Sequence, residues 1–189
     1  MAWIREQTRK WDQMLDGSRL PAWEEFPELP LYMDQVIYLM NQYLPPLTQE
    51  EERQQVTPAM INNYVKLSII PRPEKKRYAR VHLAFLVMVC VLKQTVSTAE
   101  IKKLIPVSLG EREIKPLYER FCAVFQSAKD AFRENMNQNA ARVFETDGAP
   151  LSDLIFRTAA ISALSRKWTE QVLSLYPEAD EGKAEQPRK

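Results

Sequence analysis

Lysine and arginine residues gather in one stretch of this 189-residue chain, where they could bind phosphate groups. Between Gln54 and Ile105 there are nine basic residues and two acidic ones, a net charge of +7, whereas the whole chain carries only +1. A basic segment within an otherwise acidic chain is the charge distribution expected of a surface that binds a polyanion such as DNA. This segment therefore holds the first candidates for a functional site.

Two neighbouring asparagines in this segment are candidates for contacts with DNA bases. Asn62 and Asn63 follow Thr57-Pro58, a strong signal for a helix start, because threonine caps the backbone amides and proline needs no amide hydrogen at the first helical position. We expect a short helix from there to about Leu67, with both asparagines facing outward. An asparagine side chain can pair with the N6 and N7 edge of adenine in the major groove.

The basic residues that follow this helix are expected to hold phosphate groups without reading sequence. Pro71 and Pro73 forbid a helix, so that 74–78 is predicted to be a small exposed loop or hairpin. Helix is expected to resume near Arg80. The residues that we expect to contact DNA are Asn62, Asn63, Lys66, Arg72, Lys75, Lys76, Arg77, Tyr78 and Arg80.

The elements that would position these residues are predicted to be helices. The chain has only four glycines and thirteen prolines, whereas hairpin-rich sheets need glycine or Asn-Gly at their tight turns. The run from Leu83 to Leu92 is apolar, but ten residues span only about 15 Å as a helix, about half the hydrocarbon core of a bilayer. We expect a buried helix there, no membrane partner and a cytoplasmic protein. The other helices are expected at about 3–15, 32–43 and 98–105.

The C-terminal third is predicted to form a helical hairpin. Apolar residues alternate at spacings of four and three in 114–132 and again in 154–175, and Asp147-Gly148-Ala149-Pro150 supplies a turn between them. The two helices are expected either to pair between the subunits of a homodimer or to pack on each other within one chain. The tail after Tyr176 is expected to be mobile, because no large apolar residue anchors it.

The segment from Met60 to Ile105 resembles the DNA-binding domain of the MerR family. Ile61 and Tyr64 fall on the recognition helix of that family, and Ser68 to Pro71 fall on its exit. Lys76 and Tyr78 fall on the wing, and the run 83–92 falls on the buried helix. The resemblance implies an all-α fold with a winged helix-turn-helix core and a minimal β wing. Asn62-Asn63 stand where MerR proteins usually carry an arginine and a tyrosine, and Ser68 replaces the usual glycine.

The whole chain, with its LPLYMDQV motif, also resembles a bacterial family known only as a domain of unknown function, whose members are described as regulators with a MerR-like core. Together these observations predict an N-terminal helix and acidic extended arm at 1–30 and a MerR-like winged helix-turn-helix at 31–108. A C-terminal helical hairpin is predicted at 109–176 and a mobile tail at 177–189.

The favoured function is that of a transcriptional regulator that binds double-stranded DNA. A module that keeps the winged-helix fold but binds protein instead is the alternative, and a helical sensor of small molecules is a third. An enzyme is not expected, because the chain lacks a Gly-rich phosphate loop, a nucleophile elbow and a cluster of metal ligands. No catalytic residue, metal site or cofactor is predicted.

Overall fold

The structure, a computed structural model, describes residues 2–44, 56–145 and 151–177 and is almost entirely helical over them. The prediction of an all-α chain is therefore confirmed for this part of the sequence. Apart from helices, these residues form two isolated antiparallel bridges, Leu31 with Tyr78 and Glu74 with Arg77. In chain order the helices are α1 (Ala2–Gly17), the 3-10 helix η1 (Trp23–Glu25), α2 (Met33–Tyr43), α3 (Pro58–Lys66), α4 (Arg80–Leu92), α5 (Thr98–Leu104), α6 (Glu111–Glu145) and α7 (Leu151–Ser174).

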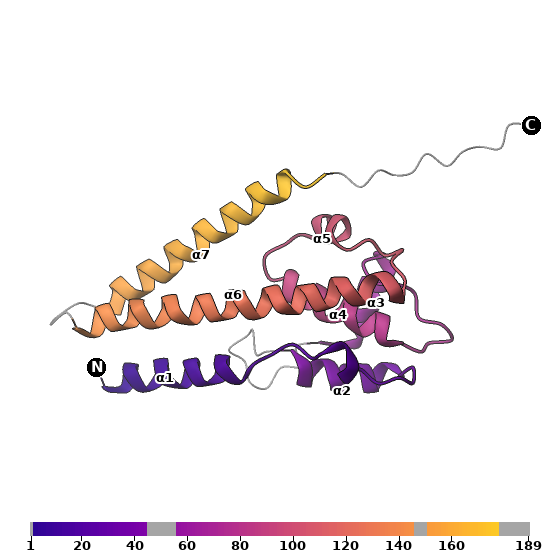
Figure 1. The fold of residues 1–189 in the computed structure, drawn as a ribbon, viewed down its shortest axis with the longest axis horizontal. Helices are drawn as coiled ribbons and strands as arrows, with labels where there is room; N and C mark the ends of the chain where they lie inside the picture. Colours follow the sequence, from indigo (N-terminus) through magenta and orange to yellow (C-terminus); the bar gives the residue numbers. More distant parts are fainter. Residues whose placement is uncertain (1, 45–55, 146–150, 178–189) are drawn as a thin grey trace, which may run out of the picture.

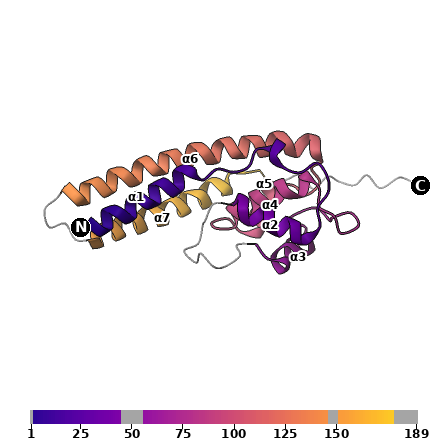
Figure 2. The same cartoon turned by 90° about the horizontal axis from the view of Figure 1, so that it is seen from below.

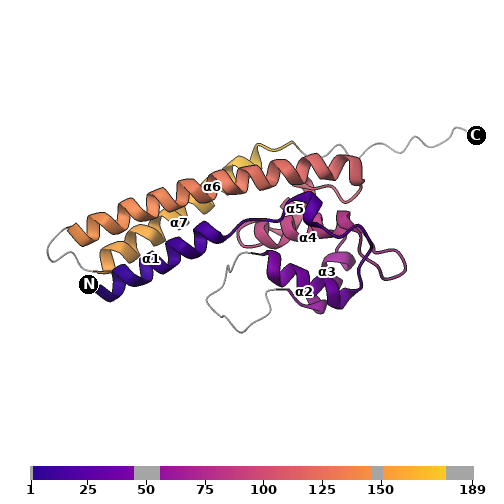
Figure 3. The ribbon, with the colours of Figure 1, turned by 60° about the horizontal axis from the view of Figure 1, so that its bottom comes forward.

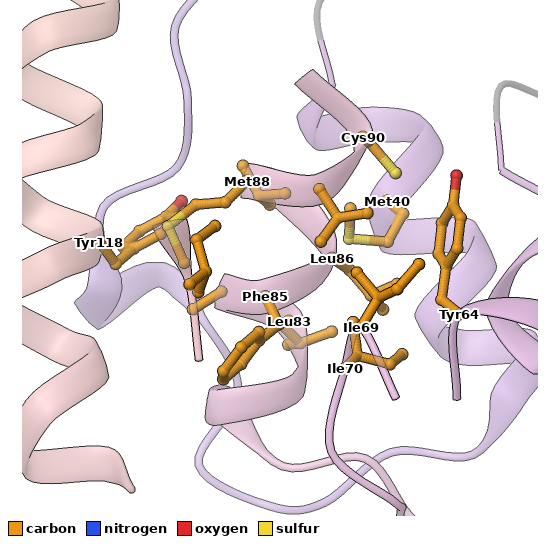
Figure 4. Packing of buried hydrophobic residues seen from close by; sticks show 14 of the residues in the cluster. Met40, Tyr64, Ile69, Ile70, Leu83, Phe85, Leu86, Met88, Cys90 and Tyr118 are labelled. Atoms are coloured by element: carbon orange, nitrogen blue, oxygen red, sulfur yellow. The ribbon is translucent and has the colours of Figure 1, made fainter. Parts of the chain in front are cut away.

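Helix α4 lies within the core and is enclosed on almost every side. Nine successive residues of this helix, from His82 to Cys90, are buried. A helix that is apolar all round is stable in water only when other elements surround it. Both α2 and α6 pack against α4, and Figure 4 shows Tyr118 of α6 and Tyr64 of α3 on opposite sides of it. The predicted buried helix is therefore confirmed, and no described helix is long and apolar enough to cross a membrane.

One buried hydrogen bond joins the beginning of this core to its end. The hydroxyl of Tyr118 donates to the backbone carbonyl of Pro21 at 2.7 Å, and its ring lies 5.2 Å from the ring of Phe26 and 6.3 Å from that of Trp23. Burial raises the pKa of the Tyr118 hydroxyl well above its usual value. The extended arm before α2 is thereby attached to α6.

Helix α6 extends far beyond the core, and α1 lies beside its outer half in all three views (Figures 1, 2 and 3). The guanidinium of Arg133 on α6 pairs with Asp12 at 2.9 Å and also with Asp16, both on α1. The ammonium of Lys129 donates to the carbonyl of Ser18 at 2.6 Å. Ion pairs and a backbone contact therefore fix α1 along α6.

The two C-terminal helices run antiparallel but diverge, so that α7 packs only loosely on α6 (Figure 1). No residue of α7 is buried. The predicted turn at 147–150 lies outside the described residues, and so does the predicted tail apart from Pro177. At its other end α6 belongs to the core, because Ile114 and Tyr118 are buried there although they stand within the predicted hairpin segment 109–176.

Replacing Tyr118 with phenylalanine tests the link between the arm and α6. The change leaves the buried carbonyl of Pro21 with only the weak donor Cys122, whose thiol lies 3.9 Å away. We expect it to lower the free energy of unfolding by about 1–3 kcal/mol. Urea denaturation measures this loss. The matched control is Tyr38→Phe, since Tyr38 is 65% exposed, and this variant is expected to match the unsubstituted protein. Equal stability of the two variants would contradict the structural role of Tyr118.

Candidate nucleic-acid interface

Helix α3 begins as the sequence predicts. The side-chain oxygen of Thr57 accepts a hydrogen bond from the backbone amide of Met60 at 3.3 Å, and Pro58 occupies the first helical position. The side chain of Asn41 on α2 holds the preceding residue, since it accepts from the amide of Val56 at 3.1 Å and donates to its carbonyl at 3.3 Å. The start of α3 is therefore fixed to α2.

The end of α3 contains a backbone conformation that usually requires glycine. The amide of Ile69 donates to the carbonyl of Tyr64 at 2.9 Å, and the amide of Ser68 donates to that of Val65 at 3.0 Å, which is a Schellman motif. Ser68 has a φ of 52°. The left-handed conformation at this residue allows the chain to turn sharply from α3 toward Pro71.

The two faces of α3 differ as predicted. Ile61 and Tyr64 are buried against the core, and burial raises the pKa of the Tyr64 hydroxyl to about 12. Asn62, Asn63 and Lys66 are exposed. Neither asparagine side chain has a hydrogen-bond partner in the part of the chain that is described, so both amide groups remain available to a ligand.

A tight turn at 74–77, named here the basic turn, projects beyond α3. The amide of Arg77 donates to the carbonyl of Glu74 at 2.8 Å, and the two residues form an antiparallel bridge. Lys75 and Lys76 occupy the tip with φ angles of 47° and 61°. Positive φ at both central residues is what a type I′ turn requires and what Asn-Gly adopts most readily. Each lysine therefore accepts backbone strain of about 1–2 kcal/mol.

Tyr78 fixes the base of this turn and is buried, which corrects its prediction as a DNA-contacting residue. Its amide and carbonyl exchange two hydrogen bonds of 2.9 Å with those of Leu31. Its side chain is only 3% exposed, and its ring lies edge-on to His82 at 5.5 Å. Because the ring fills the core beneath the turn, it positions the neighbouring cations but cannot reach a ligand.

Arg77 is exposed but is oriented by an aromatic ring that the sequence analysis did not assign to the site. The guanidinium lies 4.9 Å from the centre of the Tyr32 ring and donates to the Tyr32 hydroxyl at 2.9 Å. A cation above an aromatic face is held without losing its charge. The two residues are 45 positions apart, so that no local sequence signal could reveal the contact.

Arg80 has a structural role. Its guanidinium donates to the carbonyl of Phe26 at 2.8 Å and lies 3.7 Å from the carboxylate of Glu28. The side chain is partly buried, and it attaches the acidic arm to the start of α4. We therefore remove Arg80 from the group of cations that could contact phosphate.

The acidic arm is neutralised by cations from elsewhere in the chain. Glu24 pairs with Lys115 at 2.7 Å, and Glu25 pairs with Arg19 at 2.5 Å, which together with the amide of Ala22 lowers the pKa of Glu25 to about 2. No ion pair involves a lysine or arginine of the basic turn within the described residues. The fold therefore pairs the charges of the arm and leaves those of the turn exposed.

His82 caps the start of α4 directly beneath the turn. Its Nδ1 accepts from the amide of Ala79 at 3.0 Å, so that Nε2 carries the hydrogen, which points toward the carbonyl of Arg72 at 3.4 Å. Burial lowers the pKa of this imidazole below its usual value. The only histidine in the chain therefore has a capping role.

A groove of about 890 Å³ opens beside the turn. Its walls carry the side chains of Tyr32, Arg72, Lys75 and Arg77, with Glu74 as the only carboxylate among the lining residues. The structure thus brings the predicted residues Arg72, Lys75, Lys76 and Arg77 together at one end of the molecule. Helix α3, with Asn62, Asn63 and Lys66, lies next to them there in all three views (Figures 1, 2 and 3).

No group of three or more histidine, cysteine, aspartate or glutamate side chains is placed to hold a metal ion, as far as the described residues extend. The thiol of Cys90 is buried in the core, and burial raises its pKa to about 12. Such a thiol is neutral at physiological pH and unsuited to nucleophilic chemistry. The arrangement of exposed cations and amides on α3 and the basic turn is suited to binding an anion.

The double variant K75N/K76G separates the shape of the turn from its charge. Asn-Gly adopts the two positive φ angles with little strain, so we expect the free energy of unfolding to rise by about 1 kcal/mol, after allowance for the greater freedom of glycine in the unfolded chain. Thermal and urea denaturation measure the change. A loss of stability of similar size would show instead that the lysine side chains hold the turn.

His82 is expected to make the stability depend on pH. The pKa of His82 is lowered in the folded state. The neutral imidazole therefore contributes fully to the free energy of unfolding above the unfolded pKa of about 6.5, and this contribution is lost as the pH falls through the folded pKa. His82→Gln keeps a side-chain oxygen that can accept from Ala79 but does not titrate. Urea denaturation at pH 7.5 and pH 5 should show a smaller pH-dependent loss in this variant. An identical loss in both proteins would contradict the role of His82.

Comparison with known proteins places this core in a family. Residues 21–121, more than half of the chain, match the family model described as a domain of unknown function, DUF1836. No curated protein and no solved structure shows a significant match to the chain. The matched segment begins at Pro21 and ends just after Tyr118, the two residues that the buried hydrogen bond joins. The chain belongs to the DUF1836 family.

Proposed function

We propose that this protein is a transcriptional regulator that binds double-stranded DNA, with α3 in the major groove and the basic turn on the phosphate backbone. In this interpretation α2 and α3 form a helix-turn-helix and the basic turn is a minimal wing, so that the core corresponds to a winged helix-turn-helix of the MerR type. The elements follow the expected order: a capped short helix, a sharp exit at Ser68, the basic turn, and the buried helix α4.

The observation that carries the proposal is the pair of lysines at the tip of the basic turn. Lys75 and Lys76 hold the left-handed conformation where Asn-Gly would be relaxed. Strained positions of this kind often occur where a side chain serves a function. These two residues place two exposed ammonium groups at the tip of the turn. A polyanion is the partner that such charges attract.

The proposal gives the other residues distinct roles. Lys66, Arg72 and Arg77 would add phosphate contacts around the turn, and Tyr32 would keep the guanidinium of Arg77 in place. Asn62 and Asn63 would face the base edges, where each amide can accept one hydrogen bond and donate another to adenine. Phosphate contacts would provide most of the affinity, and the two asparagines would provide the sequence preference.

The first experiment is a selection of bound fragments from the genome, followed by a salt titration on the selected duplex. Log affinity should fall with log salt by about 0.9 for each phosphate contact, so that K75N/K76G should reduce the slope by about 1.8. The control R9Q/K10N removes two charges from exposed residues of α1, far from the turn (Figure 1), and should leave the slope unchanged. Equal slopes for all three proteins would refute the role of the turn.

Base contacts are tested separately. Asn62→Ala and Asn63→Ala should each weaken binding to the selected duplex, by about 1–3 kcal/mol for a lost bidentate contact, while binding to unrelated DNA stays the same. Fluorescence anisotropy with both duplexes measures the difference. If no fragment binds even at low salt and a defined protein co-purifies through the same surface, the alternative of a protein-interaction module replaces this proposal.

A further inference from the structure

Helix α7 carries a row of large apolar side chains that are left exposed. Its members lie at spacings of three, four, four and three residues, which places them along one side of the helix. We name this row the α7 stripe: Ile161 (36% exposed), Leu164 (71%), Trp168 (69%) and Val172 (46%) on α7, and Leu175 (76%) in the turn directly after the helix. An apolar row of this length, on a helix with no buried residue, marks a surface for binding another molecule.

The contacts that hold α7 in place leave this stripe unused. Near the beginning of the helix, Leu154 and Ile155 line a cavity of about 420 Å³ that they share with Trp11 of α1 and Met136 of α6. Near its end, Leu173 packs against the core. Figure 1 shows α7 diverging from α6 toward its C-terminal end. Because most of the stability of a helix in a protein comes from packing of its apolar face, a partner on the stripe would stabilise α7 further.

We propose that the α7 stripe pairs with the same stripe of a second copy of this chain, in antiparallel orientation about a two-fold axis at Trp168. The other members of the stripe stand four and seven residues before Trp168 and again four and seven residues after it. An antiparallel partner therefore brings Leu164 opposite Val172 of the second copy, and Ile161 opposite its Leu175. A surface that complements itself in this way is what a two-fold interface requires.

The absence of charge on the α7 stripe favours a second copy of this chain as its binding partner. The stripe contains no charged residue, and the periodicity of the helix directs Arg166, Lys167 and Glu170 away from it. On that other part of the helix surface Arg166 pairs with Glu170 at 3.4 Å and Lys167 with Glu170 at 3.3 Å. Two copies can therefore approach without bringing unpaired like charges together at the centre of the interface. A partner rich in acidic or basic groups would find no complementary charge on this face.

The exposed area of the α7 stripe is also sufficient for a specific dimer interface. The five side chains, with on the order of 100 Å² exposed on each, offer roughly 500 Å² per copy, and Tyr176 beyond them is also exposed. The two copies together would thus bury about 1,000 Å², which is the lower limit for a specific interface. Trp168 would lie at its centre, where large aromatic side chains contribute most of the binding energy.

Sedimentation equilibrium across micromolar concentrations tests the proposal. The unsubstituted protein should dimerise, and Trp168→Lys, which places two ammonium groups at the axis, should weaken dimerisation roughly 100-fold or more. The matched control is Phe156→Lys, because Phe156 lies on α7 outside the stripe and is also 69% exposed. A monomer at all concentrations, or a dimer insensitive to Trp168→Lys, would overturn the proposal. Circular dichroism verifies that each variant folds.

A charge-pairing experiment tests the antiparallel register. Leu164→Lys and Val172→Glu alone should each weaken the dimer, whereas the double variant L164K/V172E should restore much of it, because each introduced lysine then faces an introduced glutamate. A parallel pair would bring like charges together and gain nothing from the second change. Failure of the double variant to recover would overturn the antiparallel arrangement. None of these changes touches the basic turn, so the result is independent of the DNA proposal.

Discussion

The burial of α4 is the constraint on which the rest of the structure depends. Nine successive side chains, from His82 to Cys90, are removed from water, and no single partner helix could cover them all. Helix α2 and the first turns of α6 share this task, and the hydrogen bond from Tyr118 to Pro21 closes the arm over the same core. The family segment 21–121 corresponds closely to this enclosed unit, whereas α1, the outer half of α6 and α7 extend beyond it.

The same constraint positions the candidate site. Helix α4 begins where its His82 cap accepts from Ala79, and this point lies directly after the basic turn. Tyr78 attaches the turn to Leu31 by two backbone hydrogen bonds, so that its base is rigid while its tip projects. Residues that the core uses for this purpose, Tyr78 and Arg80, are unavailable to a ligand, and the cations beyond them remain exposed. Residues next to α4 therefore have structural roles, whereas the cations farther from α4 remain available to a ligand.

Local signals in the sequence predicted the helices well, because caps and apolar periodicity act over a few residues. Thr57-Pro58 marked the start of α3, and the apolar run marked α4. Contacts between distant residues could not be predicted in this way: the attachment of Arg80 to Phe26 depends on how the arm folds back. The pattern on α7 also had two interpretations, since an apolar stripe specifies that a partner exists but does not specify which one. Its exposure in the folded chain now favours a partner outside the chain.

The most direct measurement of the central claim is a nuclear magnetic resonance titration of the protein with a duplex selected from the genome. DNA binding through α3 and the basic turn should produce the largest shifts at the side-chain amides of Asn62 and Asn63 and at the backbone amides of Lys75 and Lys76, with little change on α1 or α7. Shifts concentrated on α5, α6 or α7, or no shifts at low salt, would contradict it.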